Sequence, residues 1–182
     1  MRVQACVWAA TALMMFGGAA AAEVVDSGPG GFTVRTTVHV AAPADKVYAA
    51  LVQPARWWNS EHTFSGDARN LSLDAQPGGC FCETLKNGGG VRHQTVVYVD
   101  PGRVLRLRGP LGPLQGLAVD GALTFALKPA GDGVDLQETY AVAGYAKDGL
   151  AAWPAPVDGV LAEQLGRLKR LVETGRPDEA KK

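Results

Sequence analysis

The carboxyl group best suited to acid–base chemistry in this sequence is that of Glu138. Residues 134–142 alternate as a β-strand does, and Glu138 shares its side of that strand with Leu136, Tyr140 and Val142. If that side faces inward, burial raises the pKa of the carboxyl toward the range in which it can donate and accept protons. Glu138 is therefore a candidate catalytic acid or base, with the Tyr140 hydroxyl beside it; a position at the rim of the sheet is the alternative.

A second candidate for acid–base chemistry is His62, which lies next to Glu61 in the segment SEHTFSG. Trp57 and Trp58 come shortly before it, and aromatic side chains commonly line ligand pockets. A surface loop is the alternative for His62, because the chain has no nucleophile-elbow, zinc-protease, phosphate-loop or dinucleotide motif. His39 falls on the polar side of a strand, so we expect it at the surface.

Cys80 and Cys82 lie two residues apart in a predicted strand, so their side chains share one face. Their Cβ atoms would be roughly 6–7 Å apart, too far for a relaxed disulfide unless a bulge intervenes. Redox or disulfide chemistry and inert buried thiols both remain open. A hairpin centred near Gly88 places His93 opposite or diagonal to Cys82. Two thiolates and one imidazole lack a fourth ligand for zinc, so we predict no metal site.

These residues are positioned by a strand, a short helix, several strands and a long final helix. Residues 32–40 alternate as a half-buried strand, and Pro43 and Pro54 bound a short helix. The buried face of that helix carries Val47, Ala50 and Leu51. Further strands are predicted over residues 67–74, 80–85, 91–99, 104–108, 117–127 and 134–142.

Residues 154–174 are predicted to form the long amphipathic helix. Its apolar residues recur at helical spacing and form a broad arc that includes Leu161 and Leu165. Gln164 lies near the middle of that arc, and a buried amide needs hydrogen-bond partners. Gln164 is therefore a candidate ligand contact, and a satisfied core amide is the alternative.

Aromatic and loop residues are expected to border a cavity under this helix. Trp57 and Trp58 cannot both be buried on one face of a short helix, so we expect one in the core and one at the rim, with Trp153 at the opposite rim. The segment 109–116, GPLGPLQG, is a candidate lid, and a self-packed surface loop is its alternative. A stripe of small residues on the other face of the helix is compatible with a monomer or a weak homodimer: Ala155, Gly159, Ala162 and Gly166.

Composition indicates a single, nearly neutral domain. The 182 residues include 18 basic and 18 acidic side chains, so the chain lacks the basic character of nucleic-acid binding proteins. Residues 1–22 have the features of a secretory signal peptide, and their apolar run is too short for stable membrane insertion. We expect cleavage near Ala22 and a periplasmic or secreted protein, with a flexible leader at 23–31, a domain at 32–174 and a disordered tail at 175–182.

The order of these segments resembles the START-like (SRPBCC, birch-pollen-allergen-like) superfamily. The resemblance rests on APADKVYAAL after the first strand, the WW pair, PGGCF, YVDPGRVLRL and the final helix, and it covers about residues 32–174. It is closest to the branch of chaperone-ATPase-activator homologues and polyketide cyclase-like proteins. The resemblance implies an α+β helix-grip fold, in which a curved antiparallel β-sheet wraps around the long C-terminal α-helix and leaves an internal cavity.

The resemblance also implies a function, which we state as an expectation. The protein would bind a small hydrophobic molecule of lipid, polyketide or aromatic type, with no cofactor. The predicted ligand-binding residues are Trp57, Trp58, Glu138, Tyr140, Trp153, Leu161, Gln164 and Leu165. One alternative is a cyclase-like or hydrolase-like enzyme that uses Glu138 with His62. Another is a protein-interaction module, although export would separate it from a cytosolic chaperone.

Overall fold

The structure is a computed structural model that describes residues 21–178. Eight antiparallel strands form one sheet in the order β1-β2-β8-β7-β6-β5-β4-β3. The strands are β1 (Ala21–Gly28), β2 (Gly31–Val40), β3 (Leu71–Leu73), β4 (Cys80–Thr84), β5 (Gly90–Asp100), β6 (Val104–Arg108), β7 (Ala118–Ala130) and β8 (Gly133–Tyr145). The helices are α1 (Ala44–Leu51) and α2 (Pro154–Thr174), and short 3-10 turns cover Pro54–Arg56, Ser60–His62, Ala68–Asn70, Lys86–Gly88 and Gly112–Gly116.

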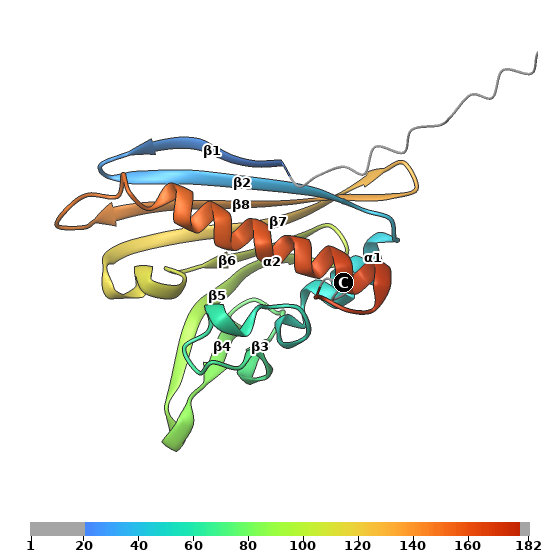
Figure 1. The fold of residues 1–182 in the computed structure, drawn as a ribbon, viewed down its shortest axis with the longest axis horizontal. Helices are drawn as coiled ribbons and strands as arrows, with labels where there is room; N and C mark the ends of the chain where they lie inside the picture. The colour runs from blue at the N-terminus through green and yellow to red at the C-terminus, as the bar shows by residue number, and fades with distance from the viewer. Residues whose placement is uncertain (1–20, 179–182) are drawn as a thin grey trace, which may run out of the picture.

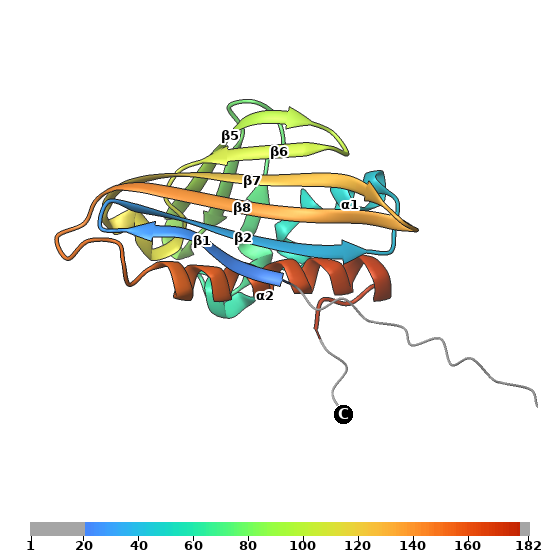
Figure 2. The ribbon, with the colours of Figure 1, turned by 90° about the horizontal axis from the view of Figure 1, so that it is seen from above.

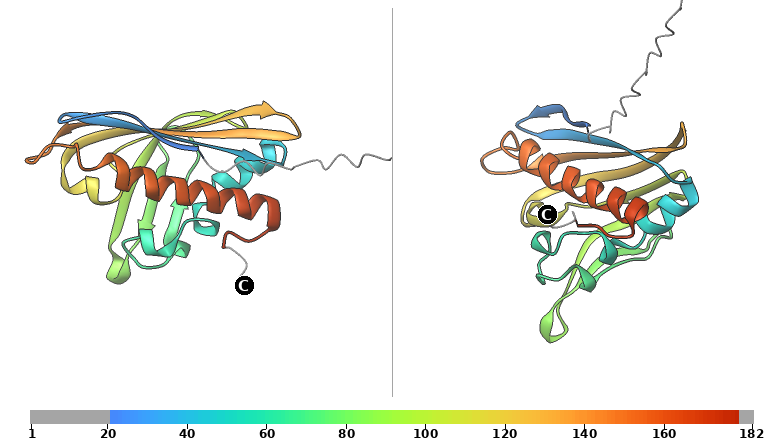
Figure 3. Two further views of the ribbon diagram at one scale, coloured as in Figure 1. Left: turned by 45° about the horizontal axis from the view of Figure 1, so that its top comes forward. Right: turned by 45° about the vertical axis from the view of Figure 1, so that its right-hand side comes forward.

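The sheet curves around α2, which crosses its concave face (Figures 1 and 3). Seen from above, α2 runs along the side of the sheet that carries β1 and β2 (Figure 2). The other half of the sheet, from β6 to β3, bends away from β2 and encloses the remaining side of the helix (Figure 3). This arrangement confirms the predicted α+β helix-grip architecture.

The core forms between the apolar face of the sheet and the apolar face of α2, both of which the periodicity of the sequence predicts. The burial of β2 alternates along its whole length, with inward-facing side chains at Phe32, Val34, Thr36, Val38 and Val40. The same faces of β7 and β8 are apolar, and α2 covers them with its own buried stripe: Leu161, Leu165, Leu168, Leu171 and Val172. Full burial of each such side chain contributes roughly 1.5–3 kcal/mol, so the periodicity is sufficient to specify this packing.

Both predicted helices are confirmed, and their ends follow from local chemistry. In α1 the expected face of Val47, Ala50 and Leu51 is buried. The helix α2 spans the predicted residues 154–174 and ends at Gly175, whose φ of 80° lies in the left-handed region. The Gly175 N–H donates to the Leu171 carbonyl oxygen at 2.9 Å, which satisfies one of the carbonyl groups left open at a helix C-terminus.

The residues expected to form a flexible leader instead form a strand. Residues 21–28 pair as β1 with the edge of β2, from Ala21 opposite Thr37 to Gly28 opposite Gly31. The stabilising contacts are backbone hydrogen bonds, which depend little on side-chain type. Val24 and Val25 are adjacent and both exposed. The segment therefore shows no alternation of apolar and polar residues, and periodicity does not identify it as a strand. The predicted cleavage site at Ala22 falls within β1, and residues 1–20 of the predicted signal peptide lie outside the described residues.

Part of the segment expected to be a disordered tail packs against α2. The Arg167 guanidinium lies 2.7 Å from the Asp178 carboxylate, and Arg170 Nε donates to the Pro177 carbonyl oxygen at 2.8 Å. Residues 175–178 are thus held by arginines of the helix that precedes them, while 179–182 lie outside the described residues. No helix within residues 21–178 is long and apolar enough to cross a membrane.

Candidate functional site

An apolar pocket of about 300 Å³ lies between the first half of α2 and the strands β4, β5 and β8. Two loops complete its wall, one formed by residues 58–64 after α1 and one by residues 111–114 between β6 and β7. Most of the lining is apolar and includes Trp58, Phe81, Leu114, Trp153 and Leu161. The few polar side chains of the wall therefore determine how this pocket can recognise or transform a molecule.

A β-bulge places an imidazole in this wall. In the pairing of β4 with β5, Phe81 lies opposite Gln94 and the next residue, Cys82, lies opposite Arg92. His93 is therefore the extra residue of the bulge, and both His93 and Gln94 are buried although they are neighbours in a strand. A regular strand would direct one of the two to the outer face.

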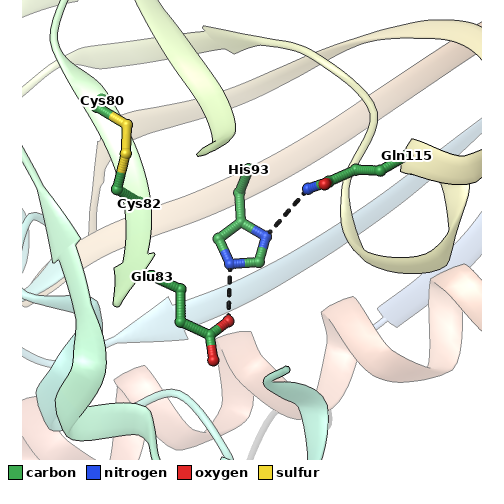
Figure 4. Close-up of a disulfide and its surroundings, with 5 residues drawn as sticks. All are labelled: Cys80, Cys82, Glu83, His93 and Gln115. Atoms are coloured by element: carbon green, nitrogen blue, oxygen red, sulfur yellow. Dashed lines mark hydrogen bonds and ion pairs between the residues drawn. A yellow bond between two sulfur atoms is a disulfide. The ribbon is translucent and has the colours of Figure 1, made fainter. Parts of the chain in front are cut away.

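His93 is hydrogen-bonded to a buried carboxylate. Its Nε2 lies 3.0 Å from Glu83 Oε2, as Figure 4 shows, and the Glu83 side chain has no exposed surface. The two Glu83 oxygens also accept hydrogen bonds from the backbone N–H groups of Phe64 and Ser65. Burial raises the pKa of Glu83, but the hydrogen bonds from Ser65, Phe64 and His93 outweigh it and hold the pKa below its ordinary value. Glu83 is thus a buried carboxylate that can remain ionised.

The environment of His93 favours the neutral ring. Burial lowers the pKa of His93, and the hydrogen bond and charge of Glu83 offset this only in part. The carboxylate accepts the Nε2–H proton, so Nδ1 carries the lone pair. Among the described residues, the one hydrogen-bond partner of Nδ1 is the side-chain amide of Gln115 at 3.4 Å (Figure 4). The pocket therefore contains a hydrogen-bond acceptor whose own partner within the described structure is distant.

Tyr140 forms hydrogen bonds to the backbone of the segment 109–116, which closes one side of the pocket. Its hydroxyl donates to the Gly109 carbonyl oxygen at 3.1 Å and accepts the Leu111 N–H at 2.8 Å. Burial raises the pKa of this hydroxyl well above its ordinary value. Gln94 also donates to the Gly109 carbonyl at 2.9 Å, and Leu114 is buried. The predicted lid segment 109–116 is therefore anchored to β5 and β8 at its base and packs into the core through Leu114.

Around the mouth of the pocket, α2 holds the loop that follows the tryptophans. His62 Nε2 lies 3.0 Å from Glu163 Oε2, and Glu163 Oε1 accepts a hydrogen bond from Asn59 Nδ2 at 2.6 Å. The neighbouring Gln164 accepts the Asn59 N–H at 2.7 Å. His62 thus lines the pocket as an exposed residue that is paired with a carboxylate from α2 rather than with its neighbour Glu61.

The predicted ligand-binding residues fall into two groups. Trp58, Tyr140, Trp153 and Leu161 line the pocket. The others do not, and are core or positioning residues: Trp57, Glu138, Gln164 and Leu165. Gln164 is a core amide that is satisfied at one end only: its oxygen accepts the Asn59 N–H, and its Nε2 is buried without a hydrogen-bond partner in the described structure.

The expectation that only one of the paired tryptophans is buried is wrong. Trp57 and Trp58 are 3% and 6% exposed. They follow a 3-10 turn instead of sharing a helix face, and their rings are inclined by 50° at a centroid distance of 5.4 Å. The indole N–H of Trp57 donates to the Ala50 carbonyl and that of Trp58 to the His62 carbonyl. Both rings can therefore be buried because each polar atom is satisfied.

Glu138 faces inward as its strand parity predicts, but it lies outside the pocket wall. It is 3% exposed and its Oε2 has no hydrogen-bond partner in the described structure. Burial raises the pKa of Glu138 well above its ordinary value, and the negative charge of Asp158 raises it further. Burial also raises the pKa of Asp158. Burial and the charge of Asp158 favour the protonated form of Glu138, and no contact with the pocket supports its use as the catalytic acid or base.

Cys80 and Cys82 are joined by a disulfide on the outer face of β4. Their Cα atoms are 5.4 Å apart, whereas residues two apart in a regular strand are separated by roughly 6.6 Å. The register shift between β4 and β5 falls next to Cys82, so the disulfide accompanies a bulge, as was expected for a bridge at this spacing. Phe81 lies between the two cysteines and Glu83 follows them, and both side chains point inward. The disulfide therefore lies on the opposite face from His93, and the three residues do not form one cluster.

Glu83 and Gln115 were not among the predicted site residues. Glu83 could have been found by the argument applied to Glu138, because it shares strand parity with the apolar Phe81. Gln115 comes from an irregular loop, for which periodicity gives no direction. His93 was considered only as a possible partner of the cysteines. Its inward direction depends on a bulge, and regular strand alternation does not predict a bulge. Among residues 21–178, no group of three or more His, Cys, Asp or Glu side chains could hold a metal ion.

Comparison with known proteins agrees with this fold. Residues 31–173 match the family described as polyketide cyclase/dehydrase and lipid transport. No curated protein matches the chain. Many solved structures share the fold. The protein CV1439 from Chromobacterium violaceum is 22% identical, with 78% of this chain and 96% of that chain covered and a TM-score of 0.55.

Two further structures extend the comparison. An uncharacterized protein from Rhizobium leguminosarum is 22% identical over 85% of this chain and 97% of that chain, with a TM-score of 0.56. CalU16 from Micromonospora echinospora is 18% identical over 87% of this chain and 85% of that chain, with a TM-score of 0.55. Similarity at this level of identity supports the fold and leaves the function to be argued from the pocket.

Proposed function

The chain belongs to the polyketide cyclase/dehydrase and lipid-transport family, and from this premise we propose that it binds one small hydrophobic molecule in the pocket beneath α2. The observation that carries the proposal is the apolar pocket of about 300 Å³ between sheet and helix. Protein interiors are otherwise close-packed, and walls held apart lose dispersion contacts. A ligand that fills the space recovers those contacts and removes apolar surface from water.

The size of the pocket limits the ligand. Ligand pockets range over roughly 300–1,000 Å³, so this one lies at the lower end. Its walls carry several flat rings, including Trp58, Phe81 and Trp153. A molecule of one or two rings suits this volume and these walls better than a lipid with two acyl chains.

Naphthalene is a suitable probe because it is apolar, flat and free of hydrogen-bonding groups. We expect it to bind saturably at one site and to quench tryptophan fluorescence, since Trp58 and Trp153 line the pocket. Val160 also lines the pocket, so Val160→Phe should fill it and weaken binding by at least about tenfold. The matched control is Val97→Phe, because Val97 lies exposed on β5. Failure of naphthalene to saturate the protein, or equal binding by both variants, would refute the proposal.

We also propose that the protein is exported. Two features support this: the signal-like N-terminal segment at residues 1–22, and the disulfide between Cys80 and Cys82, a bond that persists mainly in oxidising compartments. Cell fractionation and the intact mass of the native protein test this together. Export predicts an envelope or extracellular protein that begins near Glu23; an uncleaved chain in the cytoplasm would contradict it.

The same native preparation tests what the protein carries and how it assembles. Native mass spectrometry should show a bound apolar molecule that denaturation releases. It also reports the oligomeric state, for which the expectation of a monomer or weak homodimer stays a prediction. A chain without any ligand in every preparation would count against a carrier role.

A further inference from the structure

His93 gives the apolar pocket a directional polar group. Its ring is buried, lines the pocket and lies between two aromatic side chains, Phe64 at a centroid distance of 5.9 Å and Phe81 at 5.0 Å. Glu83 accepts the Nε2–H proton at 3.0 Å. This leaves Nδ1 as an acceptor, and Gln115 approaches it only to 3.4 Å, at the weak end of hydrogen-bond distances.

The Glu83 carboxylate that holds His93 is itself held by hydrogen bonds. Glu83 is fixed by the backbone N–H groups of Phe64 and Ser65, which belong to the loop that forms one wall of the pocket. The carboxylate therefore holds both the loop and the tautomer of the imidazole. A carboxylate that fixes a histidine in this way sets which ring nitrogen faces a ligand.

The charge distribution favours a neutral partner for Nδ1. An anionic ligand would be buried close to the Glu83 carboxylate, which is unfavourable at low dielectric. A cationic ligand would lose its hydration in apolar surroundings, while the Glu83 oxygens are already occupied by His93 and two backbone N–H groups. A neutral O–H donor satisfies Nδ1 without adding charge. Among hydroxyl compounds, an aromatic one fits between rings such as Phe64 and Phe81.

We propose that the Glu83–His93 pair is a recognition site for a phenol-type hydroxyl, which donates a hydrogen bond to His93 Nδ1 while its ring occupies the apolar pocket. The inference rests on the proposed function and adds the chemical class of the ligand. Gln115 turns aside or bonds to the hydroxyl oxygen when the phenol enters.

Three matched probes test the proposal: 1-naphthol, 1-methoxynaphthalene and naphthalene. The protein should bind 1-naphthol about fivefold to tenfold more tightly than 1-methoxynaphthalene, as one net hydrogen bond provides. His93→Phe should abolish that preference while retaining naphthalene binding. His39→Phe is the control, because His39 is paired with Asp132 and Asp135 on the opposite side of β2 from the core.

The outcomes separate this inference from the proposed function. Equal binding of naphthol and its methyl ether by the native protein, or a preference that survives in His93→Phe, overturns the hydroxyl site and leaves the pocket intact. Failure of all three probes to bind overturns the proposed function and this inference with it.

A second measurement needs no pocket variant. The chain has three histidines, so nitrogen NMR can follow each ring separately. Adding 1-naphthol should move the Nδ1 resonance of His93 and leave His39 unchanged, whereas naphthalene should not produce the change typical of an accepted hydrogen bond. An unchanged Nδ1 in the naphthol-saturated protein overturns the proposal.

Discussion

Glu83 and His93 are hydrogen-bonded side chains on paired strands, although they are not paired residues. The register places Glu83 opposite Val91, yet His93 Nε2 lies 3.0 Å from Glu83 Oε2. The bulge turns His93 inward, and it thereby connects a buried carboxylate to an apolar pocket.

This relationship predicts different titrations for His93 and His39. Burial lowers the pKa of His93, while the hydrogen bonds that His39 donates to Asp135 and Asp132 raise the pKa of His39. As pH falls, His39 should therefore gain its proton first and His93 last, in a titration followed by NMR. A His93 that titrates above 6.5 would contradict the described environment.

The same shifts have opposite consequences for stability. The folded pKa of His93 is depressed, so the unfolded chain binds the proton more readily, and stability falls as pH decreases through the unfolded value. The folded pKa of His39 is raised, so its contribution is present below the unfolded value and is lost as pH rises through the folded pKa. His93→Phe should flatten the acid side of the stability profile, and His39→Phe should lower stability near and below the His39 titration while leaving the profile above it unchanged.

Glu138 predicts a stabilising substitution. Because burial and then Asp158 raise its pKa, the unfolded chain ionises at a pH where the folded chain still holds the proton. Stability is therefore lost as pH rises above the unfolded value. Glu138→Gln removes this penalty and should raise the free energy of unfolding at pH 7 by about 1–3 kcal/mol, as measured by urea denaturation.

The pH dependence provides the control for Glu138→Gln. At pH 4 the carboxyl is largely protonated in both states, so variant and native protein should differ little. A variant that is destabilised at pH 7 would show that the Glu138 carboxylate has a partner that the described contacts do not reveal.

Tyr140→Phe tests the anchoring of the 109–116 segment. The change removes the hydrogen bonds to Gly109 and Leu111. The Gly109 carbonyl keeps the hydrogen bond from Gln94, but the Leu111 N–H loses its partner, at a cost of about 1–3 kcal/mol. Hydrogen exchange of the Leu111 amide should accelerate. Tyr48→Phe is the matched control, because the Tyr48 hydroxyl is buried without a hydrogen-bond partner in the described structure, and its removal should be neutral or slightly stabilising. Equal losses in both variants would count against the anchoring role.

The disulfide predicts a modest stabilisation. Cys80 and Cys82 close a loop of only three residues, for which the chain-entropy model gives about 1.6 kcal/mol. Cys80→Ala with Cys82→Ala should lower the free energy of unfolding by about that amount, and reduction of the native protein should add the mass of two hydrogen atoms. A native mass that reduction does not change would show that the two thiols are free.

Most of the fold could be predicted because its signals are local and periodic. The stripe of α2 and the alternation of β2 each identify the side that must be buried. The strand β1 could not be predicted, since an exposed edge strand is held by backbone hydrogen bonds that leave no pattern in side chains. The 175–178 segment was missed for a similar reason, because arginines of α2 hold it through Pro177 and Asp178.

The candidate site was harder to predict because it depends on irregular backbone. Glu138 follows strand parity and is buried as expected, but parity does not say where along the strand a pocket opens. His93 enters the pocket through a bulge, and Gln115 contacts the His93 ring from a loop. Such positions depend on which segments meet in three dimensions, information that spacing along the chain does not contain.

The bulge also makes the His93 imidazole independent of the rest of the fold. If residue 93 were deleted, Arg92 and Gln94 would become neighbours and would keep their present sides, exposed and buried. The ladder between β4 and β5 would become regular, and every other side chain would retain its face. The imidazole would leave the pocket. A single position in β5 thus controls the hydrogen-bond acceptor on the inner face of the sheet, while the apolar core that defines the fold remains in place.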